Sequence, residues 1–171
     1  MMIEEVMRCI KERRSIRKFD RARNVEEEKI QSCLEAARWA PSASNMQPWY
    51  FLIVRNKTTR EKLTELHPYG KFMVDSPVVF VPLGDPGRHH KYWHSDTAVA
   101  IQNFLLAAHA QGLGTCWAGV TGSHFEKEMK EVLGIPDDLQ IIAVVAVGYP
   151  TESPSKDRRP LVEIVSYEKY G

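Results

Sequence analysis

The chain has 171 residues, with 23 lysines and arginines against 22 aspartates and glutamates, and three cysteines. A chain of this length usually folds as one domain, and we expect residues 1–171 to do so. The balanced charge gives no reason to expect nucleic acid or a membrane surface as a partner, no apolar run reaches the ~20 residues that span a bilayer, and three cysteines without CxxC spacing indicate a reducing, cytoplasmic setting without disulfides or zinc.

The first predicted elements are two helices. Apolar residues at helical spacing within residues 3–10 predict a helix with one buried face that ends near Arg13. A second helix is expected to begin at Asn24, which forms a capping box with Glu27, and to stop before Pro41.

A loop, a strand and a third helix follow. Residues 40–49 are rich in Pro, Ser and Asn and predict a loop. Residues 49–54 lack polar alternation, which is typical of a strand buried on both faces. Thr58 and Glu61 predict a capped helix that ends near His67.

The second half repeats this alternation. Residues 77–83 predict a buried strand, and the longest helix should begin at Ser95 or Asp96 and end at Gly112. Two further strands are expected at residues 114–120 and 140–148. Between them, a helix should open with a capping box at Ser123 and Glu126 and end at Gly134.

Helices that alternate with buried strands favour one sheet covered on both faces. The tail, residues 149–171, has no predicted helix, and so long a segment without one is unusual in a compact monomer. We therefore expect the tail to pack on a partner subunit.

Two cationic segments are candidates for an anion site. In residues 13–17, arginines and a serine offer the guanidinium groups, the hydroxyl and the free backbone N–H groups that a phosphate requires. Residues 154–160 form a second cationic group in the tail. Spacing leaves open whether the two converge on one dianion or remain separate solvated patches.

Two further segments allow a ligand role and a purely structural one. Residues 41–48, PSASNMQP, could hydrogen-bond a polar heterocycle or a polyol chain, or could simply be a well-capped turn. Residues 112–120, GLGTCWAGV, lack both the Walker and the GxGxxG patterns. Their glycines could mark the close approach of a flat ligand or a tight entry into a strand.

Taken together, five segments in order resemble the short form of the nitroreductase family of FMN-dependent oxidoreductases: RRSIRKFD, APSASNMQPWYFLIV, AIQNFLLAAHAQGLGTCWAGV, LGIPDDLQIIAVVAVGYP and KDRRPLVEIV. The resemblance implies an α+β fold, a three-layer α/β/α sandwich with a mixed central sheet. It also implies an obligate homodimer with exchanged C-terminal tails and an FMN at each of two sites shared between the subunits.

By matching position, the resemblance also implies the FMN contacts. Arg13 would face the phosphate and Arg17 the pyrimidine edge near N1 and O2. Residues 41–45 would come from the partner subunit, with Gln47 just beyond them, and a backbone N–H of residues 117–119 would meet N5. Whether Arg158 or Arg159 reaches the phosphate is left open. The implied set is Arg13, Arg14, Ser15, Arg17, Pro41, Ser42, Ala43, Ser44, Asn45, Gln47, Trp117, Ala118, Gly119, Lys156 and Arg158.

The implied reaction passes a hydride from NADH or NADPH to FMN and two electrons on to a nitroaromatic, a quinone or a related small acceptor. Because the cofactor performs the bond chemistry, we expect no catalytic side chain and no metal. Two alternatives are a same-fold enzyme for reductive dehalogenation or flavin breakdown, and a flavin-binding protein without turnover. Ala118 stands where many larger members of the family carry a glutamate. The resemblance therefore does not define how nicotinamide and water are ordered at this position.

Other candidates have stronger structural explanations. His90 and His94 have a spacing that suits a metal, but they fall in a loop without an acidic or cysteine partner. Cys116 lies in a predicted buried strand and is expected to be a core residue rather than a nucleophile. The aromatic side chains of Tyr69, Phe72 and Trp93 could line the pocket over the flavin or pack in the core or the dimer interface.

Overall fold

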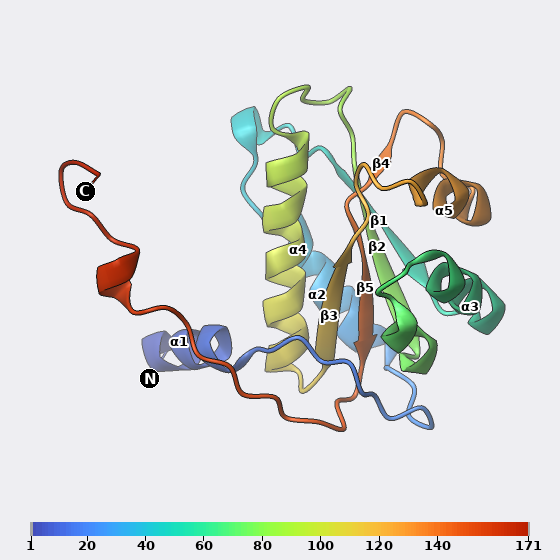
Figure 1. The fold of residues 1–171 in the computed structure, drawn as a ribbon, viewed down its shortest axis with the longest axis horizontal. Helices are drawn as coiled ribbons and strands as arrows, with labels where there is room; N and C mark the ends of the chain where they lie inside the picture. Colours follow the sequence, from blue (N-terminus) through green and yellow to red (C-terminus); the bar gives the residue numbers. More distant parts are fainter. Residues whose placement is uncertain (1, 171) are drawn as a thin grey trace.

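A computed structural model describes residues 2–170. Its helices and strands are shown in Figure 1. In chain order the described elements are α1 (Met2–Glu12), α2 (Glu27–Arg38), the 3-10 helix η1 (Ala43–Asn45), β1 (Trp49–Val54), α3 (Lys57–Leu66), η2 (Lys71–Asp75), β2 (Val78–Gly84), α4 (Trp93–Ala110), β3 (Gly114–Gly119), α5 (Glu126–Leu133), β4 (Gln140–Ile141), β5 (Ala143–Gly148) and η3 (Leu161–Glu163).

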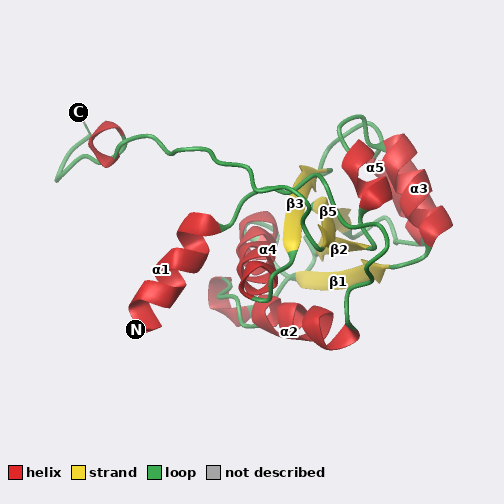
Figure 2. Ribbon diagram, turned by 90° about the horizontal axis from the view of Figure 1, so that it is seen from below, coloured by secondary structure: helices red, strands yellow, loops and turns green. Residues whose placement is uncertain are grey.

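The sheet forms the middle of three layers, as expected. Its strand order is β1-β2-β5-β3, with β4 paired to β2. Side chains alternate between the faces of β2: Phe80 belongs to the apolar cluster with α2 and α4, and Val79 to the cluster with α3 and α5. Figure 2 shows α2 and α4 on one side of the sheet and α3 and α5 on the other.

The expectation of a mixed sheet needs correction. All four ladders between the named strands are antiparallel, and the parallel contact is an isolated bridge between Ser15 and Thr115. The reason lies in the connections. Together α3 and η2 return the chain to the end of the sheet where β1 finishes, because Val79 of β2 pairs with Val54 of β1.

The predicted capping boxes are also wrong. The N-cap of α2 is Glu26 rather than Asn24, and α3 is capped by Asn56, whose Oδ1 accepts from the Thr59 N–H at 3.0 Å. Ser123 Oγ is buried and has no hydrogen-bond partner among the described residues. Many side chains can accept the free N–H groups at a helix start, and the tertiary contacts decide which one does.

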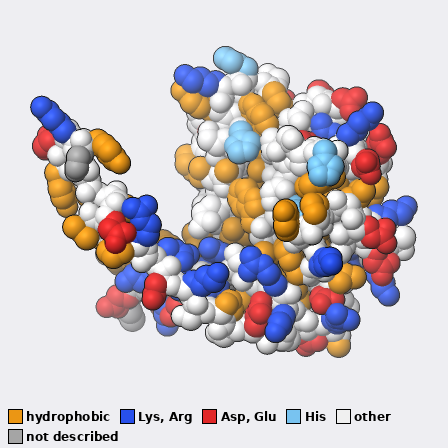
Figure 3. All heavy atoms as spheres, in the orientation of Figure 1, with side chains coloured by type: hydrophobic (Ala, Val, Ile, Leu, Met, Phe, Trp, Pro, Cys, Tyr) orange, Lys and Arg blue, Asp and Glu red, His pale blue; other side chains and the backbone are white. Residues whose placement is uncertain are grey.

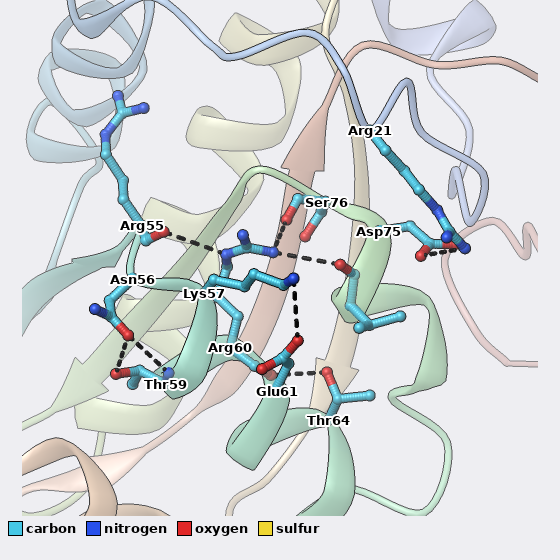
Figure 4. Close-up of polar contacts among 11 residues, drawn as sticks. Arg21, Arg55, Asn56, Lys57, Thr59, Arg60, Glu61, Thr64, Asp75 and Ser76 are labelled. Carbon is cyan, nitrogen blue, oxygen red and sulfur yellow. Dashed lines mark hydrogen bonds and ion pairs between the residues drawn. The ribbon is translucent and has the colours of Figure 1, made fainter.

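The turn connecting α3 to β2 is fixed by Arg60. Its Nη1 donates to the Ser76 carbonyl at 2.5 Å and to the Val74 carbonyl at 3.4 Å, and the Thr64 hydroxyl donates to the Arg60 carbonyl at 2.8 Å. Figure 4 shows these contacts on one side of α3. Arg60 therefore ties α3 to residues 74–76, the end of the segment that leads into β2.

Two segments leave apolar side chains uncovered. Helix α1 forms where predicted, but its apolar face is not buried within the chain: Ile3 is 81% exposed and Val6 59%. The tail extends away from the body, and Val162 within it is 85% exposed. Figures 1 and 3 show the tail standing apart from the rest of the molecule. Over residues 2–170, no helix combines the length and apolar character needed to cross a membrane.

Candidate functional site

The two cationic segments, far apart in sequence, meet in the structure. They enclose a cavity of about 170 Å³. Its lining residues are Arg13, Arg14, Ser15, Arg17, Pro154, Lys156 and Arg158. The question that sequence spacing left open is therefore answered: the segments converge.

Backbone pairing brings them together. Residues 15–20 run between β3 and the chain that leaves β5, because the Ile16 N–H donates to the Thr115 carbonyl at 2.9 Å and the Thr151 N–H donates to the Lys18 carbonyl at 3.0 Å. The carboxylate of Glu152 accepts from the Arg17 N–H at 2.6 Å. Figure 1 shows the two segments running side by side beneath β3. The tail consequently leaves the body beside the first cationic segment.

Gly114 allows this close pairing. A Cβ at this position would lie 2.8–2.9 Å from three side-chain atoms of Ile16. Ile16 itself is buried in the core, so it has little room to move away. The glycine at the start of β3 therefore marks close packing of the Ile16 side chain against the strand, rather than the approach of a ligand.

The cavity concentrates positive charge. Burial, followed by the nearby charges of Arg158 and Arg14, lowers the pKa of the Arg13 guanidinium. Arg14 folds back and donates through Nη1 to the carbonyls of Lys11 and Arg13, so its head group also closes the end of α1. Bound anionic oxygens would relieve the mutual repulsion of these cations.

The structure distinguishes the two neighbouring arginines of the tail. Arg158 lines the cavity. Arg159 instead donates to Glu163, through Nε to Oε2 at 3.3 Å and through Nη2 to the carbonyl at 2.9 Å. Arg158 is thus the better candidate for an anion contact.

The outer edge of β3 lies next to this cavity. The carbonyls of Thr115 and Gly119 accept hydrogen bonds from Ile16 and His67, so both point away from β5. Because residues alternate along a strand, the N–H groups of Trp117 and Gly119 point to the same outer edge. Between the two contacts, this edge extends for about 13 Å.

Side chains along β3 differ in their access to that region. Trp117 is 36% exposed, whereas Ala118 is buried in the cluster with α3 and α5. Any ligand contact of Ala118 would therefore involve its backbone. A Cβ at Gly119 would meet only Trp117 Nε1 within 4 Å, at 3.9 Å, so the space on that side is open.

The aromatic candidates separate in the structure. Phe72 is partly buried and lies under Arg17, whose Cζ is 6.0 Å from the ring centroid. Tyr69 is exposed, and Trp93 packs against the core on the α4 side. Of these three aromatic residues, Phe72 contacts a residue of the cationic cavity.

The loop at residues 41–47 has an unusual backbone. Ser44, Asn45 and Gln47 have positive φ values of 51°, 55° and 49°, a region that non-glycine residues adopt uncommonly and that is often found at functional sites. Two side chains hold this shape. Asp96 Oδ2 accepts from the Ala43 N–H, and Ser42 Oγ accepts from the Gln47 N–H, both at 3.0 Å.

This loop does not meet the cationic cavity within one chain. It is bonded to Asp96 in the first turn of α4, whereas the cationic segment lies beside Gly112 and Leu113, just beyond the other end of that helix. An 18-residue helix is about 27 Å long. Within one chain, the predicted site residues Pro41, Ser42, Ala43, Ser44, Asn45 and Gln47 are therefore separated from the cationic ones.

Sequence reasoning missed three residues that organise the site. Asp96 shapes the loop, Glu152 shapes the cationic segment, and His67 contacts the end of β3. The sequence predicts for Asp96 only the role of a helix cap. No local pattern identifies the other two, because their partners are backbone groups distant in sequence.

The remaining candidates carry no separate site. Cys116 is buried, and burial raises the pKa of its thiol, which fits a core residue. His89 Nδ1 accepts from the Tyr92 N–H at 3.1 Å, which orders the loop that contains His90, whereas His94 lies in the first turn of α4 rather than in a loop. Across residues 2–170, no group of three or more His, Cys, Asp or Glu side chains is placed to hold a metal ion.

Known proteins resemble this chain in sequence and in fold. The profile of the nitroreductase family matches residues 10–67 and 64–149. A relative from Methanothermobacter thermautotrophicus, named "Putative NADH dehydrogenase/NAD(P)H nitroreductase", is 41% identical over 153 residues, covering 88% of this chain and 80% of the relative.

Solved structures of similar proteins have the same fold. A crystal structure with the same name from Parabacteroides distasonis superimposes with a TM-score of 0.93 at 29% identity, covering 97% of this chain and 99% of that one. An FMN-dependent nitroreductase from Clostridium difficile R20291 gives 0.88 at 27% identity, with coverage of 96% and 99%.

Proposed function

The chain belongs to the nitroreductase family, and we propose that it binds FMN and passes a hydride from NADH or NADPH to a small acceptor such as a nitroaromatic or a quinone. The observation that carries the proposal is the convergence of Arg13, Arg17, Lys156 and Arg158 on one cavity. The FMN named for the similar structure from Clostridium difficile further supports it.

The residues present fit the parts of FMN. A phosphomonoester carries a charge of about −2 and three strong acceptor oxygens, which suit a cavity lined by guanidinium groups, an ammonium and a hydroxyl. A flat ring system has an edge with hydrogen-bond acceptors, which suits the outward N–H groups of β3. The open side of Gly119 leaves space for such a ring.

When bound, FMN supplies hydride acceptance and donation at its ring. The protein supplies position and electrostatic field. Arg13, Lys156 and Arg158 would neutralise the phosphate, and Arg17 would lie near the pyrimidine edge, where a cation stabilises negative charge on the ring. No side chain of this chain is required to transfer a proton, so we assign none a catalytic role.

The proposed assembly is a homodimer in which residues 41–47 of one subunit complete the site of the other. Three features support it. The loop is held away from the cavity of its own chain. The apolar face of α1 borders a groove of about 420 Å³ beside α4 that is lined by Val6, Ile10 and Leu106. Residues 161–170 of the tail expose apolar side chains that a partner could cover.

The test is an absorption spectrum of the purified protein before and after anaerobic NADH or NADPH. We expect a yellow protein that bleaches on reduction and recovers its colour when a nitroaromatic or a quinone is added. Bleaching without recovery would favour another acceptor, such as a halogenated aromatic. A yellow protein that neither nucleotide bleaches would favour flavin binding without turnover, and a protein that stays colourless with excess FMN would refute the proposal.

A further inference from the structure

His67 is a buried histidine at the junction of α3, β3 and α5. The residue is only 4% exposed to solvent. It ends α3, since its N–H donates to the Leu63 carbonyl at 3.1 Å, and its ring lies 4.8 Å from the ring of Phe125. On another side, a Cβ at Gly70 would come within 2.8 Å of the His67 Cβ, so the turn fits closely around it.

Both ring nitrogens of His67 contact backbone groups. The Tyr69 N–H donates to Nδ1 at 3.2 Å, and Nε2 lies 3.0 Å from the Gly119 carbonyl oxygen. A backbone N–H can only donate, so Nδ1 must be the accepting nitrogen. The proton of the neutral ring is then on Nε2, which donates to Gly119.

This hydrogen bond fixes the last residue of β3. The next peptide N–H, that of Val120, donates to the Ile142 carbonyl at 3.1 Å. The peptide group between Gly119 and Val120 is therefore held at its oxygen by His67 and at its nitrogen by Ile142. Without the histidine, the constraint on the carbonyl oxygen would be lost. Gly119 could then change conformation, because glycine has the greatest backbone freedom of any residue.

The Gly119 N–H points to the same open edge as its carbonyl, next to the contact with His67. We propose that His67 is a positioning residue that holds Gly119 so that its N–H is aimed at the reactive edge of the flavin. The inference rests on the proposed function, because that function places a flavin at this edge. His67 itself exchanges no proton and no electron in the reaction.

Two substitutions separate aiming from packing. His67→Gln keeps a side-chain N–H donor near the position of Nε2, whereas His67→Phe keeps a ring against Phe125 and removes the donor. Arg13→Ala is the matched comparison for cofactor binding, because Arg13 lines the cationic cavity and not this edge. Thermal unfolding of the flavin-free variants identifies any variant that fails to fold.

The first measurement is the anaerobic rate of flavin reduction by NADH or NADPH in stopped flow, with the FMN dissociation constant measured alongside. For His67→Phe we expect the rate to fall at least about tenfold while FMN affinity changes by less than about threefold, since a misaimed donor weakens stabilisation of developing charge. His67→Gln should stay within about threefold of the unmodified protein in rate. Equal rates in the unmodified protein, His67→Gln and His67→Phe would overturn the inference. A His67→Gln variant as slow as His67→Phe would overturn it as well.

The second measurement needs no flavin. Nitrogen chemical shifts of the ring should place the proton on Nε2, and ¹⁵N relaxation should report a rigid Gly119 amide that becomes mobile in His67→Phe. An amide equally rigid in both proteins, or a proton on Nδ1, would overturn the inference even if His67→Phe could not be loaded. An unmodified protein that binds no FMN would instead refute the proposed function, and the relaxation result would still decide whether His67 holds Gly119.

Discussion

At the scale of single residues, Arg158 and Arg159 show how two adjacent identical side chains acquire different roles. Arg158 lines the cavity with Arg13 and Lys156, whereas Arg159 is hydrogen-bonded to Glu163, four residues further along the tail. The alternation of side chains along an extended tail separates them. Sequence reasoning identified the cationic group and could not choose between the two.

This difference predicts a paired result. Arg158→Ala should weaken FMN binding by at least ~1.5 kcal/mol, the low end for a hydrogen bond to a charged group, because it removes a guanidinium from the proposed phosphate site. Arg159→Ala, the matched control, should change the affinity by less than ~0.5 kcal/mol. Flavin fluorescence titration measures both dissociation constants, and equal losses for the two variants would contradict the assignment.

At the scale of elements, Glu126 illustrates a right residue with a wrong role. It was expected to complete a capping box with Ser123, but it lies buried in the first turn of α5 and bonds elsewhere. Its Oε1 accepts from the Ile141 N–H at 2.9 Å, and its Oε2 accepts from the Gly122 N–H at 2.7 Å. The carboxylate thus ties α5 to β4 and to the chain that follows β3.

Removing this carboxylate should be costly. We expect Glu126→Ala to lower the free energy of unfolding by about 3 kcal/mol, since it leaves two backbone donors without their acceptor and removes the carboxylate 4.0 Å from the buried Lys130 ammonium, which keeps its hydrogen bond to the Asp137 carbonyl. Glu128→Ala, on the exposed side of the same helix, should cost less than about 0.5 kcal/mol. Urea unfolding of the flavin-free protein measures both, and a Glu126→Ala variant as stable as Glu128→Ala would refute the tie.

The succession of elements could be predicted from sequence, because it depends on local periodicity and on stop signals. Gly112 and Gly134 end their helices with φ values of 77° and 66°, as glycines at such positions usually do. The strand directions and the site could not, because they depend on distant pairs. Glu152 holds Arg17 from 135 positions away, and no window of sequence contains both. Only the resemblance to a family connected the two cationic segments in advance.

At the scale of the whole molecule, a single chain leaves apolar surface exposed and parts of the predicted site far from one another. The apolar face of α1 and the tail are exposed, and the loop at residues 41–47 is shaped by Asp96 at a distance from the cavity. In the proposed homodimer, a second copy would account for each of these features. The proposed dimer would bury apolar surface that an isolated domain of this size would otherwise leave in water.

The separation of loop and cavity along α4 has a consequence for mixtures of defective proteins. In the proposed dimer each subunit would lend its loop to one flavin and its arginines to the other. Neither Arg13→Ala/Arg158→Ala nor Ser42→Ala/Asn45→Ala should turn over at low FMN. Refolded together, they should regain activity, because a hybrid pair concentrates both lesions in one pocket and leaves the other intact.

Refolding Arg13→Ala with Arg158→Ala provides the comparison, since every pocket of that hybrid still lacks an arginine. Shared sites would be demonstrated if the mixture of the arginine and loop variants regains activity and the mixture of the two single arginine variants does not. If neither mixture revives, each polypeptide must build its pocket alone, and the roughly 27 Å that α4 spans would have to be bridged in some other way.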